Sequence, residues 1–144
     1  MRILLDSNIL IRAFARSQGL AYELLTAILA SDHTLILSDE ILFEVARVLR
    51  YPRLMAVHGQ SEETIYDFTS WLRDGAEIVA LNRLTATPIR DLSDVFVLQT
   101  VLSGEADVLC TNDRDFFEPP ASTFLASIGI AVLTDAQLIR RLGG

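Results

Sequence analysis

Residue types that build many common functional sites are scarce in this sequence. Cys110 is the single cysteine, which excludes an internal disulfide and indicates a reducing compartment, and we expect it to be a buried strand residue. With only His33 and His58, a zinc site of the Cys/His type lacks ligands. No apolar run approaches the roughly 18 residues of a membrane span, and no signal peptide is recognisable. We therefore expect a cytoplasmic protein without membrane association.

Lysine is absent as well, since all 12 basic residues are arginine. A codon bias is the simpler explanation, although arginine also suits bidentate contacts with phosphate. The formal net charge of −7 argues against nucleic acid, because phosphate binding normally needs a basic surface. That argument weakens if some of the 19 acidic residues hold divalent cations, which cancel negative charge where the ligand binds. Any such site must use carboxylates, which suit Mg²⁺ or Mn²⁺.

The 144 residues alternate strand-like and helix-like apolar patterns, and we predict a single domain over residues 1–144. Predicted strands cover residues 2–5, 34–37, 76–81, 106–110 and 130–133. Predicted helices cover residues 6–15, 21–30, 38–50, 61–73, 91–103 and 134–143, with a loop at residues 82–88. Strands separated by helices indicate a three-layer α/β/α fold with a central parallel sheet of four to five strands.

Capping and breaking residues set several of these boundaries. Thr134 and Gln137 form a capping box for the last helix. We expect Pro52 to end the helix at residues 38–50, and Pro119 and Pro120 to break any helix that follows the fourth strand.

Polar and acidic residues follow two of the predicted strands directly. Asp6 follows the strand at residues 2–5, and Asp113 and Asp115 follow the strand at residues 106–110. Ligands of open α/β sheets bind outside the carboxyl ends of the strands, so these acids are expected in one crevice. Taken singly, Asp6 and Asp113 are better explained as helix caps.

Two further acids border the apolar faces of predicted helices. Glu44 lies beside the buried stripe of its helix, and a solvated or Arg47-paired glutamate explains it equally well. Asp94 shares a helix face with Leu98, where a carboxylate is costly unless something compensates it. The helix N-terminus is an equally good explanation for Asp94, with Asp91 as the cap.

The combination of these acids favours a shared site. Like charges about 5 Å apart repel by roughly 3 kcal/mol at an effective dielectric constant near 20, so a converging cluster needs a cation or raised pKa values. The chemistry open to such a cluster is metal-assisted hydrolysis of a phosphodiester, in which the cation polarises the phosphoryl oxygen and activates water.

On these residues the chain resembles the PIN-domain nucleases, most closely the VapC-type toxins of toxin–antitoxin systems. The resemblance covers essentially the whole chain. It rests on short motifs that occur in order, namely Asp6-Ser7-Asn8, Glu44, Arg90-Asp91 with Asp94, and Thr111-Asn112-Asp113-Arg114-Asp115-Phe116. Each motif is weak alone, but their order and structural context make the match specific.

The resemblance implies a Mg²⁺- or Mn²⁺-dependent endoribonuclease that cleaves RNA, is inhibited by a cognate antitoxin, and forms a homodimer. The metal-binding and catalytic acids that it implies are Asp6, Glu44, Asp94 and Asp113, with Asp115 or Asp91 as a fifth. The residues implied to orient them are Ser7, Asn8 and Thr111. Leu92 and Val95 depart from the third motif of the family, which usually has proline and a further acid there. Loss of that acid removes a candidate ligand of a second metal ion, so we expect activity to be weak or tuned rather than absent.

The remaining candidates have simpler structural explanations. Arg47, Arg50 and Arg53 are candidates for a basic edge that grips RNA phosphates, and a solvated helix face is the simpler reading. Tyr66 and Trp71 suit either a dimer or antitoxin surface or the core.

Three alternatives to a nuclease also account for acids at the ends of strands. Response-regulator receivers and haloacid-dehalogenase phosphatases also place aspartates at strand ends, but both need a lysine that this chain lacks. The serious alternative is a catalytically silent PIN domain that acts as an RNA- or protein-binding module.

Overall fold

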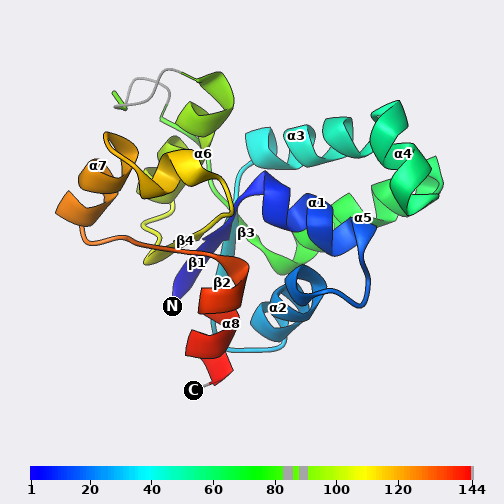
Figure 1. The fold of residues 1–144 in the computed structure, drawn as a ribbon, viewed down its shortest axis with the longest axis horizontal. Coiled ribbons are helices and arrows are strands. Elements are labelled where there is room, and N and C mark those ends of the chain that lie inside the picture. The colour runs from blue at the N-terminus through cyan, green and yellow to red at the C-terminus, as the bar shows by residue number, and fades with distance from the viewer. Residues whose placement is uncertain (83–85, 88–90, 144) are drawn as a thin grey trace.

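A parallel five-stranded sheet in the order β3-β2-β1-β4-β5 forms the centre of the fold. The structure is a computed structural model that describes residues 1–82, 86–87 and 91–143. The strands are β1 Arg2–Leu5, β2 Thr34–Leu37, β3 Glu77–Ile78, β4 Val108–Cys110 and β5 Ala131–Leu133. Helices flank this sheet, so the predicted α/β/α fold with a central parallel sheet is confirmed (Figure 1).

The central strand β1 is buried and paired on both sides. Leu4 lies opposite Ile36 of β2 and Leu109 of β4. All three side chains are fully buried, which is why these strands read as unbroken apolar runs in the sequence.

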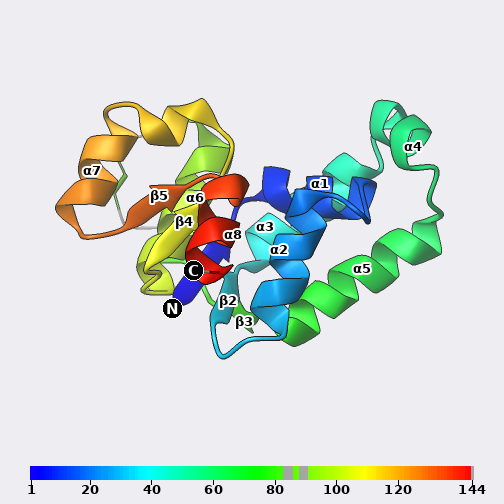
Figure 2. The ribbon, with the colours of Figure 1, turned by 60° about the horizontal axis from the view of Figure 1, so that its bottom comes forward.

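Helices connect and cover the strands. They are α1 Ser7–Ala15, α2 Leu20–Leu29, α3 Asp39–Leu49, α4 Pro52–His58, α5 Glu62–Gly75, α6 Leu92–Ser103, α7 Ala121–Ser127 and α8 Asp135–Gly143, with a 3₁₀ helix η1 at Arg114–Phe117. Two views agree that α6 and α7 lie on one side of the sheet and α1 and α2 on the other (Figures 1 and 2). Helix α8 packs against α2, and α3 packs against α1 and α5. Among the described helices, none is long and apolar enough to cross a bilayer.

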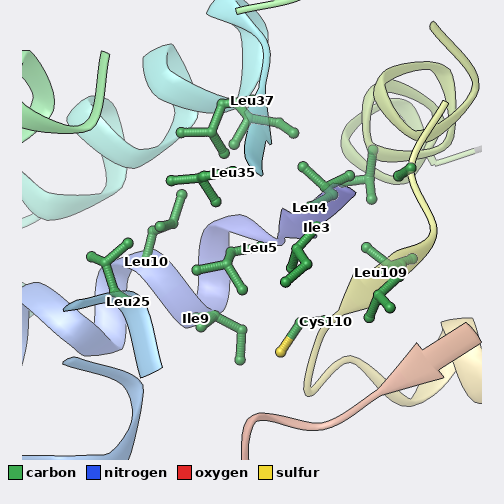
Figure 3. Packing of buried hydrophobic residues seen from close by; sticks show 14 of the residues in the cluster. Ile3, Leu4, Leu5, Ile9, Leu10, Leu25, Leu35, Leu37, Leu109 and Cys110 are labelled. Atoms are coloured by element: carbon green, nitrogen blue, oxygen red, sulfur yellow. The ribbon is translucent and has the colours of Figure 1, made fainter. Parts of the chain in front are cut away.

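The main core lies between the sheet and the α1–α2 side. Side chains from β1, β2, β4, α1 and α2 pack together there, and Cys110 is buried among them (Figure 3). Neighbouring strand residues point to opposite faces, so Ile36 meets α6 instead. A Cβ added to Gly104, just after α6, would lie 2.4 Å from Ile36 Cγ2. Close packing at Gly104 therefore fixes the end of α6 against β2.

Most predicted boundaries are confirmed, and the differences concern short elements. Pro52 ends α3 as expected, but it also begins α4, because proline is well suited to the first helical turn. Helix α7 follows Pro119 and Pro120 and was not predicted. Strand β3 has only two residues rather than the predicted span of 76–81. The predicted loop at residues 82–88 and Arg90 of the third motif lie largely or wholly outside the described residues.

Candidate metal centre

The acids that follow β1 and β4 lie where the strand order reverses. From β1 the chain adds β2 and β3 on one side, and later β4 and β5 on the other. In open α/β sheets the crevice at such a reversal is the usual ligand site. Asp6 follows β1 there, and Thr111 and Asp113 follow β4. The backbone N–H of Asp6 donates to the Cys110 carbonyl at 2.9 Å, which ties the two strand ends together.

Asp6 is held in one orientation by three neighbours that the sequence had singled out. Its Oδ1 accepts from the Ser7 backbone N–H at 2.7 Å, and its Oδ2 accepts from Thr111 Oγ1 at 2.7 Å and Asn8 Nδ2 at 3.2 Å. Its side chain is only 4% exposed. Asp6 is thus the N-cap of α1, as predicted, and its Oδ2 in addition contacts Thr111, the residue that follows β4.

Burial raises the pKa of Asp6 to about 6, even though the hydrogen bonds from Thr111 and Ser7 lower it. The charges of Glu44 and Asp113 raise the pKa of Asp6 further. Glu44 is half-buried on α3. Electrostatic repulsion thus links acids from β1, α3 and the segment after β4, as expected for a converging cluster.

Asp94, Asp113 and Asp115 come together most closely. Each offers one carboxylate oxygen, and these oxygens lie within 4.8 Å of one another. Asp113 is positioned by its backbone N–H, which donates to Thr111 Oγ1 at 3.0 Å, and its Oδ1 accepts from the Asp115 N–H at 3.0 Å. The structure therefore brings an acid from α6 to those that follow β4.

Asp94 has the most strongly perturbed carboxyl of this group. Burial raises its pKa to about 7, and the charges of Asp113, Asp91, Asp6 and Asp115 add to the shift. Asp91 caps α6, since its Oδ1 accepts from the Asp94 N–H at 3.3 Å. Asp94 therefore lies in the first turn of a capped helix, and it is also close to the carboxylates of other acids.

The three predicted RNA-gripping arginines are exposed on α3 and α4 or just beyond α3. Arg47 donates to the hydroxyl of Tyr51, and its guanidinium lies 5.5 Å from the centre of the Tyr51 ring. Arg50 pairs with Glu62 at 2.5 Å. Two of the three therefore already have partners within the chain, and their role in RNA binding stays a prediction.

Cys110 is fully buried, as predicted. Burial raises the pKa of its thiol to about 12, with added contributions from Asp135 and Asp6. A thiol held neutral in this way is no nucleophile, because thiolate is the reactive form.

A hydrogen bond between two buried hydroxyls was not predicted from the sequence. Ser38 Oγ and Thr100 Oγ1 lie 2.8 Å apart, and both residues are fully buried. This hydrogen bond joins the start of α3, which carries Glu44, to α6, which carries Asp94. The residues are 62 positions apart, and nothing in local sequence indicates that they meet.

The donor set of the cluster fits a hard divalent cation. All of its charged side chains are carboxylates, the oxygen ligands that Mg²⁺ and Mn²⁺ prefer. Burial, and after it repulsion from neighbouring acids, raises the pKa values of Asp6 and Asp94, and a bound cation would offset that repulsion. Asp94, Asp113 and Asp115 are the residues whose oxygens are already close enough to share one ion.

Comparison with known proteins identifies the family. One solved structure of similar fold is VapBC2 from Rickettsia felis bound to a promoter DNA fragment, with a TM-score of 0.61 and 14% identity over 93% of this chain and 98% of that chain. Another is VapBC-1 from nontypeable Haemophilus influenzae, with a TM-score of 0.57 and 17% identity over 94% and 99% of the two chains. No curated protein matches the sequence. A family model described as PIN domain matches residues 2–115, which include every acid of the cluster, and the chain belongs to the PIN domain family.

Proposed function

We propose that this protein is a Mg²⁺- or Mn²⁺-dependent endoribonuclease and the toxin component of a type II toxin–antitoxin system. The observation that carries the proposal is the convergence of Asp94, Asp113 and Asp115, with carboxylate oxygens within 4.8 Å, next to the buried Asp6. Acids that served only as separate helix caps or first-turn residues would have no reason to meet at one point, whereas ligands of one cation must.

The proposed metal ligands are the acids around this point. Asp94, Asp113 and Asp115 would hold the ion directly, with Asp6 and Glu44 completing the negative site. Asp91 has a structural role as the cap of α6, and its charge adds to the field at Asp94. When bound, the cation supplies an activated water and stabilises negative charge on the phosphate.

Polar side chains next to the acids orient them by hydrogen bonds. Thr111 donates to Asp6 and accepts from the Asp113 N–H, so one hydroxyl orients two acids. Asn8 donates to the same oxygen of Asp6 at 3.2 Å. Val95 supplies no carboxylate to the third motif, so the second-metal position has one acid fewer, and we expect slow cleavage rather than none.

The proposed partners follow from the family and the fold. Both similar solved structures are VapBC structures, and one contains promoter DNA. By analogy, a cognate antitoxin is the proposed protein partner and RNA the proposed substrate, with a homodimer as the proposed assembly and the cytoplasm as the proposed location. The net charge of −7 makes a neutralising cation a condition of RNA binding at the acids.

RNA cleavage tests the proposal. Purified protein is incubated with a mixed-sequence RNA in Mg²⁺, in Mn²⁺ and in EDTA, and Asp113→Asn is tested beside Asp32→Asn. Asp32 is exposed and lies in the turn before β2, at the opposite edge of the sheet. Cleavage by the wild type and Asp32→Asn, lost in EDTA and in Asp113→Asn, supports the nuclease. Metal-independent RNA or antitoxin binding without cleavage would favour the silent binding module.

A further inference from the structure

A polar cavity lies on the side of α1 that faces α8. It has a volume of about 360 Å³, and Arg12, Arg16, Gly19, Leu20 and Asp135 line it. The side chain of Arg12 is 51% exposed and that of Asp135 only 8% exposed. Arg16 is exposed as well. The accessible charge of this cavity is therefore mostly positive, in a protein whose net charge is −7.

Arg12 is fixed in place but retains most of its donors. Its Nη1 lies 3.4 Å from Asp135 Oδ2, and this is its ion pair within the described part of the chain. A guanidinium has five N–H donors in a planar fork. Asp135 is itself held by its Oδ1, which accepts from the Ala136 N–H at 2.8 Å. One long contact thus orients Arg12 and leaves N–H groups for an external anion.

Arg16 has no side-chain hydrogen bond or ion pair with any residue that the structure describes. Its side chain runs beside Gly19, where an added Cβ would lie 3.2 Å from Arg16 Cβ and 3.9 Å from its Cδ. Glycine at this position therefore leaves room for the stem of Arg16 along the cavity wall. A guanidinium that is packed at its stem but lacks an internal partner is suited to an external anion.

The cavity lies along the same sheet edge as the acidic cluster. Asp135 follows β5, Asp6 follows β1, and both strands pair in register with Cys110 of β4. Neighbouring strands are about 4.8 Å apart, so the ends of β1 and β5 are roughly 10 Å apart. Arg12 lies on the helix that Asp6 caps. Arg16 lies at the far end of that helix, roughly 15 Å from Asp6 at 1.5 Å per residue, and a short stretch of extended nucleic acid spans both distances.

We infer that Arg12 and Arg16 form a phosphate subsite for single-stranded RNA, which holds the strand backbone beside the phosphodiester at the acidic cluster. This inference rests on the proposed ribonuclease function. The chemistry recognised is a backbone phosphate, so the subsite positions the strand without reading its sequence. The two arginines also give this acidic protein a positively charged surface beside the acids. Arg47 and Arg50 are less suited to that role because they already bind Tyr51 and Glu62.

The test is the salt dependence of RNA binding in the cleavage-deficient Asp113→Asn background. A short fluorescent single-stranded RNA of mixed sequence is titrated by anisotropy over a series of salt concentrations. The variants are Arg16→Gln, and Arg12→Gln combined with Asp135→Asn so that no buried carboxylate loses its partner. Arg141→Gln is the matched control, because Arg141 is exposed in the last turn of α8 and belongs neither to the cavity nor to the predicted basic edge.

Each subsite variant should weaken binding about threefold to tenfold and lower the slope of log affinity against log salt by about 0.7, as for one lost phosphate contact. Arg141→Gln should leave both unchanged. Equal effects of Arg16→Gln and Arg141→Gln, or none from Arg16→Gln, overturn the subsite but leave the nuclease standing. Failure of the Asp113→Asn parent to bind RNA overturns the subsite, and the additional absence of cleavage by the wild type overturns both proposals.

Discussion

Replacing Asp94 by asparagine should stabilise the metal-free protein at about pH 8. The carboxylate oxygens of Asp94, Asp113 and Asp115 lie within 4.8 Å, and the pKa of Asp94 is raised to about 7. Two charges at this distance repel by about 1 kcal/mol in water and about 3.5 kcal/mol at an effective dielectric constant of 20. Asp115 is exposed, so the lower end of that range applies, and we expect a gain of about 1 to 2 kcal/mol.

Thermal unfolding measures this gain. In EDTA, Asp94→Asn should melt about 3 to 8 °C above the wild type. Added Mn²⁺ should reverse the order, because the wild type gains the binding free energy of the cation and the variant loses a ligand. Asp32→Asn, at the opposite edge of the sheet, should follow the wild type under both conditions. If Asp94→Asn melts below the wild type in EDTA, or gains as much from Mn²⁺, the reasoning is refuted.

Three further predictions concern acidity, hydrogen bonding and packing. Burial raises the pKa of Asp6 from 3.8 to about 6, so the folded state holds this proton more tightly than the unfolded state. The free energy of unfolding of the metal-free wild type, measured in urea, should therefore fall by up to about 3 kcal/mol relative to that of Asp6→Asn as the pH rises from about 4 to 6. A relative rise in stability over this range would contradict the prediction. Thr111→Val should cost about 1 to 3 kcal/mol of stability and weaken Mn²⁺ binding in calorimetry, because it removes a 2.7 Å donor to Asp6; unchanged affinity would argue against the orienting role. Gly104→Ala should cost about 1 to 3 kcal/mol of stability, seen as a lower melting temperature, because its Cβ would lie 2.4 Å from Ile36 Cγ2. Gly143→Ala should leave the melting temperature unchanged, because its Cβ would have no neighbour within 4 Å.

The sheet and the strand-end acids could be predicted because their signals are local. A buried parallel strand such as β1 is an unbroken apolar run, and the polar residues after it mark where it ends. Because neighbouring parallel strands end at the same edge of the sheet, the residues that follow them lie close together. Asp6 and Asp113 could thus be placed together from sequence alone, without any knowledge of the distance between them.

Features that depend on contacts between distant segments could not be predicted. The Ser38–Thr100 hydrogen bond joins the N-cap of α3 to a residue 62 positions away, and the cap signal at Ser38 does not indicate that partner. Asp135 does follow a strand, as Asp6 does, but its proximity to Arg12 depends on how α8 packs. Helix α4 was missed because Pro52 was read only as a stop, although proline also suits the first turn of a helix.

The basic surface shows the same limitation. The sequence offers Arg47, Arg50 and Arg53 as a basic edge beside the acids, but Arg47 and Arg50 bind Tyr51 and Glu62. Periodicity places residues on one helix face and does not reveal which neighbours neutralise them.

The most direct test of the central claim is a crystal of the wild type soaked in Mn²⁺ and measured at a wavelength where manganese scatters anomalously. We predict an anomalous peak among the carboxylates of Asp94, Asp113 and Asp115, about 2.1 to 2.2 Å from their oxygens. No peak at millimolar Mn²⁺, or one confined to another part of the surface, would contradict the claim that these acids form a metal centre.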